Sequence, residues 1–209
     1  MIHVVLCDDH AVVRRGIRDT LSEAVDIKVT GEAGGYAELR ELLRSTPCDV
    51  LLLDLSMPGR GGLEVLTGLT ETDSPVKVLV VSMFPADQYA IRCLRAGAKG
   101  YVSKAGDPDE LIAATRTVAQ GRKYVTAEVA QMLADSVSRP TLEAPHAALS
   151  ERELQTLVKI ASGQRLSDIA EELMLSPKTV SVYRTRVMEK PGLPTNAALT
   201  VYAIRNNLI

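Results

Sequence analysis

Apolar and polar positions follow two distinct patterns along the first 121 residues. Short apolar runs typical of buried strands are separated by longer segments in which apolar residues recur at spacings of three and four, as on one face of a helix. The predicted strands are residues 2–7, 27–33, 50–53, 77–81 and 99–103. The predicted helices are residues 12–21, 36–43, 63–69, 88–94 and 111–118. This five-fold alternation predicts an α/β domain with a doubly wound, five-stranded parallel sheet, in which the fully apolar third strand is central.

A second region begins after the last of these helices, which we expect to end at Gly121. Residues 126–134 fit a further short helix, whereas residues 136–148 are rich in Ser, Pro and Ala and lack a clear period. We therefore predict a first domain at residues 1–121 and a linker at residues 122–148.

The remaining residues carry the pattern of a small all-α domain at residues 149–209. Ser150 and Glu153 have the spacing of a capping box, and Gly163 is expected to stop the helix that follows. Ser176 before Pro177 marks a second clear helix start. The predicted helices are residues 151–162, 166–173, 177–190 and 195–206. A tight turn between the second and third predicts a helix-turn-helix.

The composition is that of an ordinary globular protein, with 46% hydrophobic and 24% charged residues. The net charge of -2 gives no global sign of nucleic acid, but residues 178–190 carry four basic residues against one Glu. No uninterrupted apolar run approaches the ~20 residues that span a bilayer. Because the sequence also opens directly on a predicted strand, we expect a cytoplasmic protein without a membrane partner.

Polar residues follow four of the five predicted strands. Asp8 and Asp9 follow the first strand, Asp54 the third, Ser82 the fourth and Lys104 the fifth. Because the carboxyl ends of parallel strands meet at one edge of the sheet, we expect these side chains to converge. An acidic pair after a strand is often only a helix N-cap, but the agreement of four strand ends predicts a shared site.

These residue types suit a site that accepts and holds a phosphoryl group. A carboxylate can attack a phosphoryl donor to give an aspartyl phosphate, and Asp54 is the predicted nucleophile. Crowded carboxylates repel one another, so a hard dication, Mg²⁺ or Mn²⁺, is expected among them. The predicted ligands are Asp8, Asp9, Asp54 and the backbone carbonyl of Ser56. Lys104 and the hydroxyl of Ser82 are expected to bind the phosphoryl oxygens.

The same residues resemble the receiver domain of bacterial two-component response regulators. The motifs that carry the resemblance are Asp8-Asp9, Asp54 followed by Met57-Pro58 and Gly61-Gly62, Ser82, and the run Gly100-Tyr101-Val102-Ser103-Lys104. The resemblance covers residues 1 to about 121. It implies a flavodoxin-like fold, phosphotransfer from a histidine kinase to Asp54, and a switch in which Ser82 moves toward the phosphoryl group while Tyr101 turns inward. Ordinary strand packing is the alternative for Tyr101, and Ala105 stands where many receivers have a Pro with a cis peptide.

The C-terminal domain resembles the LuxR-type helix-turn-helix that ends response regulators of the NarL/FixJ family. Residues 149–153, 167–173 and 175–182 carry this resemblance. A bare helix-turn-helix is also a common way to pack three helices. Its position after a receiver-like domain makes DNA the expected partner.

The predicted third helix separates a polar stripe from an apolar one. The polar stripe holds the predicted DNA contacts, which are Lys178, Ser181, Val182, Thr185 and Arg186. The resemblance places base contacts at Ser181, Val182 and Thr185, whereas Lys178 and Arg186 suit phosphates. Val180, Tyr183 and Val187 face the core side. Arg184 borders that side, where either a phosphate or an internal salt bridge is open to it.

The fourth predicted helix carries Leu199 and Tyr202, through which the resemblance implies dimerisation. The alternative is that these residues only close the core of the domain. The side chains expected to contact bases are small and include few that can donate two hydrogen bonds to one base. This predicts modest specificity per half-site, so we expect a homodimer on activation. Pro191 departs from the family pattern, and because Pro disrupts a helix interior we expect the third helix to stop by Lys190.

Together these features predict a transcription factor controlled by phosphorylation, in which charge at Asp54 biases a two-state receiver and raises the affinity for promoter DNA. We expect no enzymatic activity beyond self-phosphorylation and slow self-dephosphorylation of Asp54. One rival interpretation is a Mg²⁺-dependent phosphatase or phosphotransferase, although Ser56 stands where such enzymes generally have a second acid. The other is a helix-turn-helix that binds protein and never contacts DNA.

Overall fold

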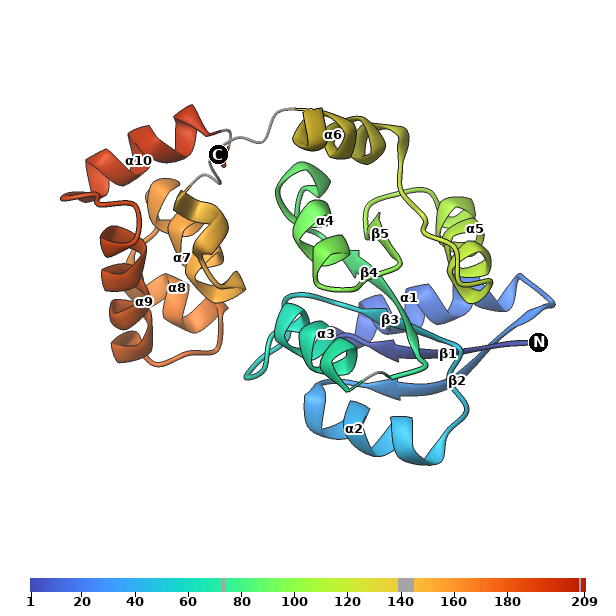
Figure 1. Cartoon of the computed structure of the whole chain (residues 1–209). Coiled ribbons are helices and arrows are strands. Elements are labelled where there is room, and N and C mark those ends of the chain that lie inside the picture. Colours follow the sequence, from blue (N-terminus) through green and yellow to red (C-terminus); the bar gives the residue numbers. More distant parts are fainter. Residues whose placement is uncertain (73, 139–144, 207) are drawn as a thin grey trace. The chain divides into compact units, whose positions relative to one another are not determined.

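The chain forms two compact units, Met1–Asp135 and Ser136–Ile209, in the computed structural model. The structure describes residues 1–72, 74–138, 145–206 and 208–209. The first unit contains a five-stranded parallel sheet with the order β2-β1-β3-β4-β5 (Figure 1). Its strands are β1 (Ile2–Cys7), β2 (Ile27–Ala33), β3 (Val50–Leu53), β4 (Lys77–Ser82) and β5 (Gly100–Ser103). The central position of β3 is confirmed, and all its residues are buried.

A helix follows each strand, as the sequence pattern predicts. The helices are α1 (Ala11–Ser22), α2 (Tyr36–Ser45), α3 (Gly62–Glu71), α4 (Ala86–Arg95) and α5 (Pro108–Ala119). Figure 1 shows α1 and α5 on one face of the sheet and α2, α3 and α4 on the other. Alternate residues of β1 face the two layers: Val4 and Leu6 pack with Leu21 of α1 and Leu111 of α5 in one core cluster. The doubly wound arrangement is therefore confirmed.

The strand register brings the carboxyl ends of the central strands together. Cys7 of β1 pairs with Leu53 of β3, and Leu53 pairs with Val80 of β4. The ladder continues just past the strands, where the Lys104 N–H donates to the Ser82 carbonyl at 2.9 Å. The residues that follow β1, β3 and β5 consequently start from one edge of the sheet.

The chain after α5 lies along the outer edge of β5. Gly121, with φ 79°, ends the α5 region as predicted, and the Tyr124 N–H then donates to the Lys99 carbonyl at 2.7 Å. Tyr124 also forms an isolated parallel bridge with Gly100. The short helix predicted at 126–134 is present as α6 (Ala127–Ser138). Part of the predicted linker is thus helical; its residues 139–144 lie outside the described residues.

The second unit is a bundle of short helices. They are α7 (Glu151–Ala161), α8 (Leu166–Glu172), α9 (Pro177–Glu189) and α10 (Asn196–Arg205), preceded by the 3₁₀ turn η1 (Pro145–Ala148). The predicted capping box at Ser150 is confirmed, as are the left-handed Gly163 and the N-cap at Ser176. In neither unit, over the described residues, is a helix long and apolar enough to cross a membrane.

Candidate functional site

Three of the predicted phosphoryl-site residues are in direct contact at the carboxyl edge of the sheet. The Lys104 ammonium lies 2.6 Å from one oxygen of Asp8 and 3.0 Å from one oxygen of Asp54. Asp8 and Asp54 are buried, with 3% and 2% of their surface exposed. The Asp54 N–H donates to the Cys7 carbonyl at 2.8 Å, which fixes the start of the loop beyond β3. The predicted convergence of these strand ends is confirmed.

Asp9 and His10 complete an acidic cluster around this point. Asp8, Asp9, His10 and Asp54 each offer a ligand atom within 4.8 Å of the others. His10 precedes the first residue of α1, and its Nδ1 lies 2.8 Å from Asp9 Oδ1. This contact was not predicted, although the position of His10 directly after the acid pair in the sequence could have indicated it.

The donor set of the cluster fits a hard dication. Both oxygens of Asp54, and one oxygen each of Asp8 and Asp9, are buried and have few donors: the ammonium of Lys104 lies beside Asp8 and Asp54, His10 beside Asp9, and the Ser56 backbone beside Asp54. Buried carboxylate oxygens without donors are costly unless a cation compensates them. Oxygen ligands of this kind are those that Mg²⁺ prefers. Ser56, whose carbonyl is the fourth predicted ligand, is half-buried in the loop after Asp54.

The electrostatic environment of Asp54 depends on opposing contributions. Burial raises the pKa of the Asp54 carboxyl, and the negative charge of Asp8 raises it further, whereas Lys104 lowers it. The net direction is upward. A cation bound beside Asp54 would favour the ionised, nucleophilic form, because an opposite charge stabilises a carboxylate.

Ser82 and Tyr101 lie together beside the site. Ser82 is the last residue of β4, 1% exposed, and its hydroxyl accepts a hydrogen bond from the Phe84 N–H at 3.2 Å. Tyr101 is 2% exposed and its hydroxyl donates to the Phe84 carbonyl at 2.7 Å. Burial raises the pKa of Tyr101. Tyr101 therefore points inward in this conformation, and its movement on phosphorylation stays a prediction.

Two sequence details of the site have structural outcomes. Met57 is fully buried against Cys7, with 3.2 Å between the two sulfur atoms, so it packs the loop after Asp54 against β1. The described part of the chain has no cis peptide bond, so the bond between Lys104 and Ala105 is trans.

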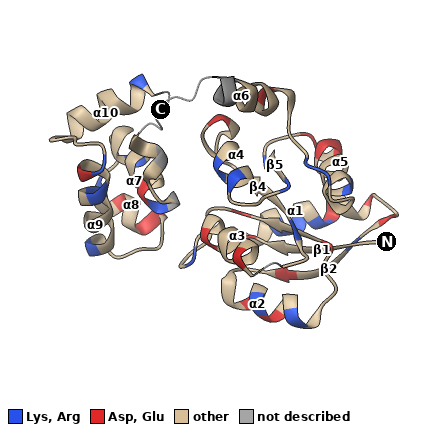
Figure 2. Cartoon of the chain, in the orientation of Figure 1, with Lys and Arg blue, Asp and Glu red and all other residues tan. Residues whose placement is uncertain are grey.

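The exposed face of α9 carries the predicted DNA contacts. Lys178, Ser181, Val182, Thr185 and Arg186 are all exposed. On the opposite side, Val180 and Val187 are fully buried and Tyr183 is half-buried. Figure 2 shows basic residues distributed along this helix. The division into a core face and a polar face is confirmed, whereas the individual contacts with DNA stay predictions.

Arg184 has an internal role that the sequence left open. Its guanidinium donates to the Asn196 side-chain oxygen at 3.1 and 2.9 Å. Asn196 is the first residue of α10. Arg184 thus links α9 to the start of α10 through an amide, neither of the two partners that the sequence analysis considered.

The end of α9 is tied to the start of α7. The helix ends at Glu189, as expected from Pro191, and the Lys190 ammonium lies 2.6 Å from the Glu153 carboxylate. Glu153 is 2% exposed and also accepts from the Ser150 N–H at 2.8 Å. Burial raises the pKa of Glu153, but Lys190 and Ser150 outweigh burial and hold it below its usual value. The capping box was predicted from the sequence, but the ion pair between Lys190 and Glu153 was not.

We expect Glu153→Ala to destabilise the second unit by about 2 kcal/mol, because it removes a cap and leaves Lys190 without its partner. Glu153→Gln keeps an acceptor for Ser150 and should lose about half of this. Since the folded-state pKa is depressed, the advantage of wild type over Glu153→Gln is present above the unfolded pKa of about 4.3 and is lost as the pH falls through the folded value. Urea unfolding followed by NMR signals of residues 149–206 measures it. Glu189→Ala, at an exposed position, is the control, and an equal loss there would contradict the assignment.

The predicted dimerisation residues of α10 have different surroundings. Leu199 is fully buried, so the prediction that it forms a dimer contact is corrected: it closes the core of its own domain. Tyr202 is half-buried, and its hydroxyl accepts from the His146 N–H at 3.2 Å. Val201 and Ile204, which the sequence analysis did not name, are 48% and 57% exposed. They give α10 its accessible apolar surface.

Comparison with known proteins identifies both domains. The family model "Response regulator receiver domain" matches residues 4–116, and "Bacterial regulatory proteins, luxR family" matches residues 147–203. The chain is 41% identical to the response regulator UvrY of Escherichia coli K12 over 209 residues, which cover 100% of this chain and 96% of UvrY. The chain is a response regulator of the NarL/FixJ family.

Other relatives of this response regulator span its full length. It is 36% identical to the response regulator GacA of Pseudomonas aeruginosa over 210 residues, covering 100% of this chain and 98% of GacA. Among solved structures, RcsB of Salmonella enterica serovar Typhimurium, bound to the promoter rprA in the presence of phosphomimetic BeF₃⁻, has a TM-score of 0.63 at 27% identity. That match covers 96% of this chain and 97% of RcsB. The response regulator therefore has two domains, a receiver followed by a LuxR-type DNA-binding domain.

Proposed function

We propose that Asp54 is the phosphoacceptor of this response regulator and receives its phosphoryl group from a histidine kinase. The observation that carries the proposal is the buried contact of Asp54 with Lys104, beside Asp8, at an edge where carboxylate oxygens lack hydrogen-bond donors. Asp8 is the other buried carboxylate in contact with Lys104. Its Oδ1 accepts the His10 N–H at 2.8 Å and its Oδ2 lies 2.6 Å from Lys104, so both of its oxygens are engaged. Lys104 contacts only the Oδ1 atom of Asp54, whose carboxylate also interacts with the Ser56 backbone. We therefore assign the nucleophile to Asp54.

In the proposed reaction an Asp54 oxygen attacks the phosphorus of the donor phosphohistidine. The new O–P bond forms as the P–N bond breaks, and the imidazole leaves with the bonding electron pair. Lys104 and Ser82 bind the phosphoryl oxygens as charge moves onto them. Mg²⁺ or Mn²⁺ held by Asp8, Asp9, Asp54 and the Ser56 carbonyl would neutralise the crowded negative charge.

We propose no turnover of an outside substrate. Besides accepting the phosphoryl group, Asp54 would lose it slowly to water. Ser56 occupies the position where aspartate-nucleophile hydrolases generally carry a second acid, so a general acid for a leaving group is absent there. A steady-state assay with small phosphate esters would reveal an enzyme if product accumulated beyond one equivalent.

The proposed output is binding of promoter DNA in the cytoplasm by residues 149–209, controlled by the receiver at residues 1–121. Ser181, Val182 and Thr185 would contact base edges, while Lys178 and Arg186 would bind phosphates. Phosphorylation would favour a homodimer, which supplies the affinity that one small helix lacks. Within α10, the half-buried Tyr202 and the exposed Val201 are the candidate dimer contacts.

Replacing Lys178 or Arg186 by Gln should weaken binding to duplex DNA of any sequence. Each variant should reduce the slope of log affinity against log salt by about 1, because one phosphate contact and its released counterion are lost. Fluorescence anisotropy at several salt concentrations, with and without a phosphodonor, measures both quantities. Lys123→Gln removes the same charge from an exposed position of the first unit and should change neither. If the C-terminal domain never contacts DNA, all three variants should show the same DNA affinity and the same salt dependence.

A further inference from the structure

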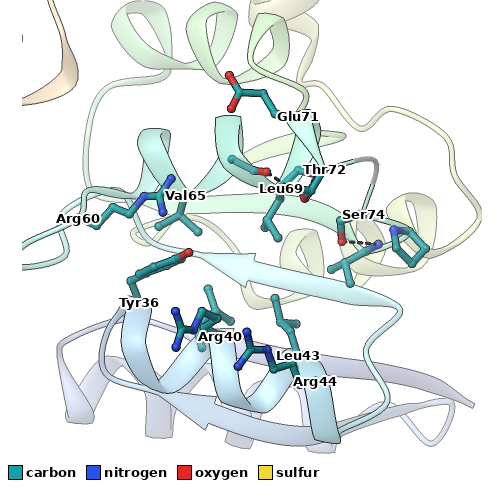
Figure 3. Close-up of a pocket in the computed structure, with 14 residues that line it drawn as sticks. Tyr36, Arg40, Leu43, Arg44, Arg60, Val65, Leu69, Glu71, Thr72 and Ser74 are labelled. Atoms are coloured by element: carbon teal, nitrogen blue, oxygen red, sulfur yellow. Dashed lines mark hydrogen bonds between the residues drawn. The ribbon is translucent and has the colours of Figure 1, made fainter.

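A cavity separates α2 from α3 on one face of the sheet (Figure 3). Its volume is about 610 Å³, within the range of roughly 300–1,000 Å³ typical of small-molecule sites. None of its lining residues belongs to the predicted phosphoryl site or to the DNA-binding face of α9.

The floor of the cavity is apolar. Leu39 of α2 and Val65 of α3 lie at its base and are each 1% exposed. Above them, Leu43 and Leu69 are half-buried and project into the space from opposite helices, as Figure 3 shows. An occupant with an apolar body would bury these side chains and displace water from them.

The rim of the cavity is cationic. Arg40 and Arg44 line it from α2, and Arg60 lines it from the loop before α3. Arg60 is stacked over the Tyr36 ring, with 4.5 Å from its guanidinium carbon to the ring centroid. Stacking of this kind orients a guanidinium while leaving its N–H edge for acceptors. One Arg60 N–H donates to the Glu64 carbonyl at 3.4 Å, and the proposed ligand would bind to the remaining donors.

Few acids offset this charge. Glu71 is the one acid among the described lining residues, and Figure 3 shows its carboxylate pointing away from the space between the helices. Arg40 and Arg44 share one acceptor, the Glu41 Oε1 atom, at 3.4 and 3.2 Å. These pairs are exposed on both sides and therefore weak. The rim keeps a net positive charge above an apolar floor.

We propose that the cavity between α2 and α3 is a second ligand site, which binds a small amphipathic carboxylate. The apolar body would lie between Leu43 and Leu69, and the carboxylate would be held by Arg40 and Arg60. A carboxylate suits the planar guanidinium group, which can donate two parallel hydrogen bonds to it. None of the residues proposed to contact the ligand belongs to the phosphoryl site.

Decanoate, below its micelle concentration, is a direct probe of the proposal. Titrated into the ¹⁵N-labelled full-length protein, it should shift amide signals of α2, α3 and the Arg60 loop and few elsewhere. Decanamide, which keeps the chain but lacks the charge, should bind about 3- to 10-fold more weakly, as expected for partly exposed charge-assisted hydrogen bonds. Decylammonium should bind more weakly still, because the rim repels it.

Variants separate a specific head-group contact from general hydrophobic binding. Arg40→Gln and Arg60→Gln should each weaken decanoate about 3- to 5-fold and leave decanamide unchanged, a difference that misfolding would not produce. Arg15→Gln removes an exposed arginine of α1, on the other face of the sheet, and should have no effect. Asp54→Asn should bind decanoate like wild type, so loss of the phosphoryl function would not affect this result. Equal affinities for decanoate and decanamide, or shifts centred outside α2 and α3, would overturn the proposal.

Discussion

Asp54→Asn is expected to lower the rate of phosphorylation by a small-molecule phosphodonor by about three orders of magnitude or more, to below detection. The amide oxygen is a far weaker nucleophile than a carboxylate. The substitution leaves Asp8 beside Lys104. Because Asp8 also accepts the His10 N–H at 2.8 Å, we do not expect it to attack the phosphodonor in place of Asp54. Wild type should gain the mass of one phosphoryl group with acetyl phosphate and Mg²⁺, and the variant should gain none.

Asp49→Asn is the matched control for this experiment. It makes the same chemical change directly before β3, at the end of the strand opposite to Asp54, where Asp49 accepts the His3 N–H at 2.8 Å. This variant should be phosphorylated like wild type. Intact-mass spectrometry under conditions that preserve acyl phosphates is the measurement. If Asp54→Asn were fully phosphorylated and Asp8→Asn were not phosphorylated, Asp8 rather than Asp54 would be the phosphoacceptor. Genome-wide mapping of occupied DNA sites in wild type and Asp54→Asn would then test the coupling to transcription.

Sequence patterns predicted those parts of the structure that depend on interactions between residues close together in the chain, or on the geometry of a parallel sheet. The run 50–53 is apolar throughout, so it could only be a strand buried on both faces, and β3 is central. Ser150 caps α7 because a hydroxyl there satisfies a backbone N–H that the helix leaves free. The contact of Asp8 and Asp54 with Lys104 was predictable because parallel strands fix which ends meet.

Other features depend on contacts between segments distant in sequence. Lys190 pairs with Glu153 across 37 positions, and nothing near Lys190 distinguishes it from a phosphate-binding lysine. The helical period places Leu199 on one face of α10 but does not say which neighbour covers that face, so its burial was left open. The cavity beneath Arg60 likewise exists only because α2 and α3 flank it on the same face of the sheet.

Gly62→Ala is expected to have a large effect on both the stability and the chemistry of the receiver. A Cβ atom at Gly62 would lie 2.1 Å from the Asp54 carbonyl oxygen and 2.7 Å from the Leu55 Cα. These are backbone atoms, so no side-chain rotation relieves the overlap. The loop must move, and the hydrogen bond from the Gly62 N–H to the Leu55 carbonyl, 3.1 Å long, moves with it. We expect a loss of about 3 kcal/mol from the first unit, at the upper end for overpacking.

The displaced loop should also misplace Asp54 relative to Lys104. Displacement of a reacting group by roughly 1 Å can reduce a rate about 100-fold, so phosphorylation of Gly62→Ala should be slower by up to this factor even in the folded fraction. Gly16→Ala provides the contrast, because a Cβ there meets nothing within 4 Å and the residue lies inside α1. That variant should gain about 0.5–1 kcal/mol from helix propensity and keep the wild-type rate. Urea unfolding followed by amide signals of residues 2–119, with initial rates of labelling, distinguishes them. If both glycines tolerated alanine equally, the close approach of α3 to the phosphoacceptor backbone would not be what positions Asp54.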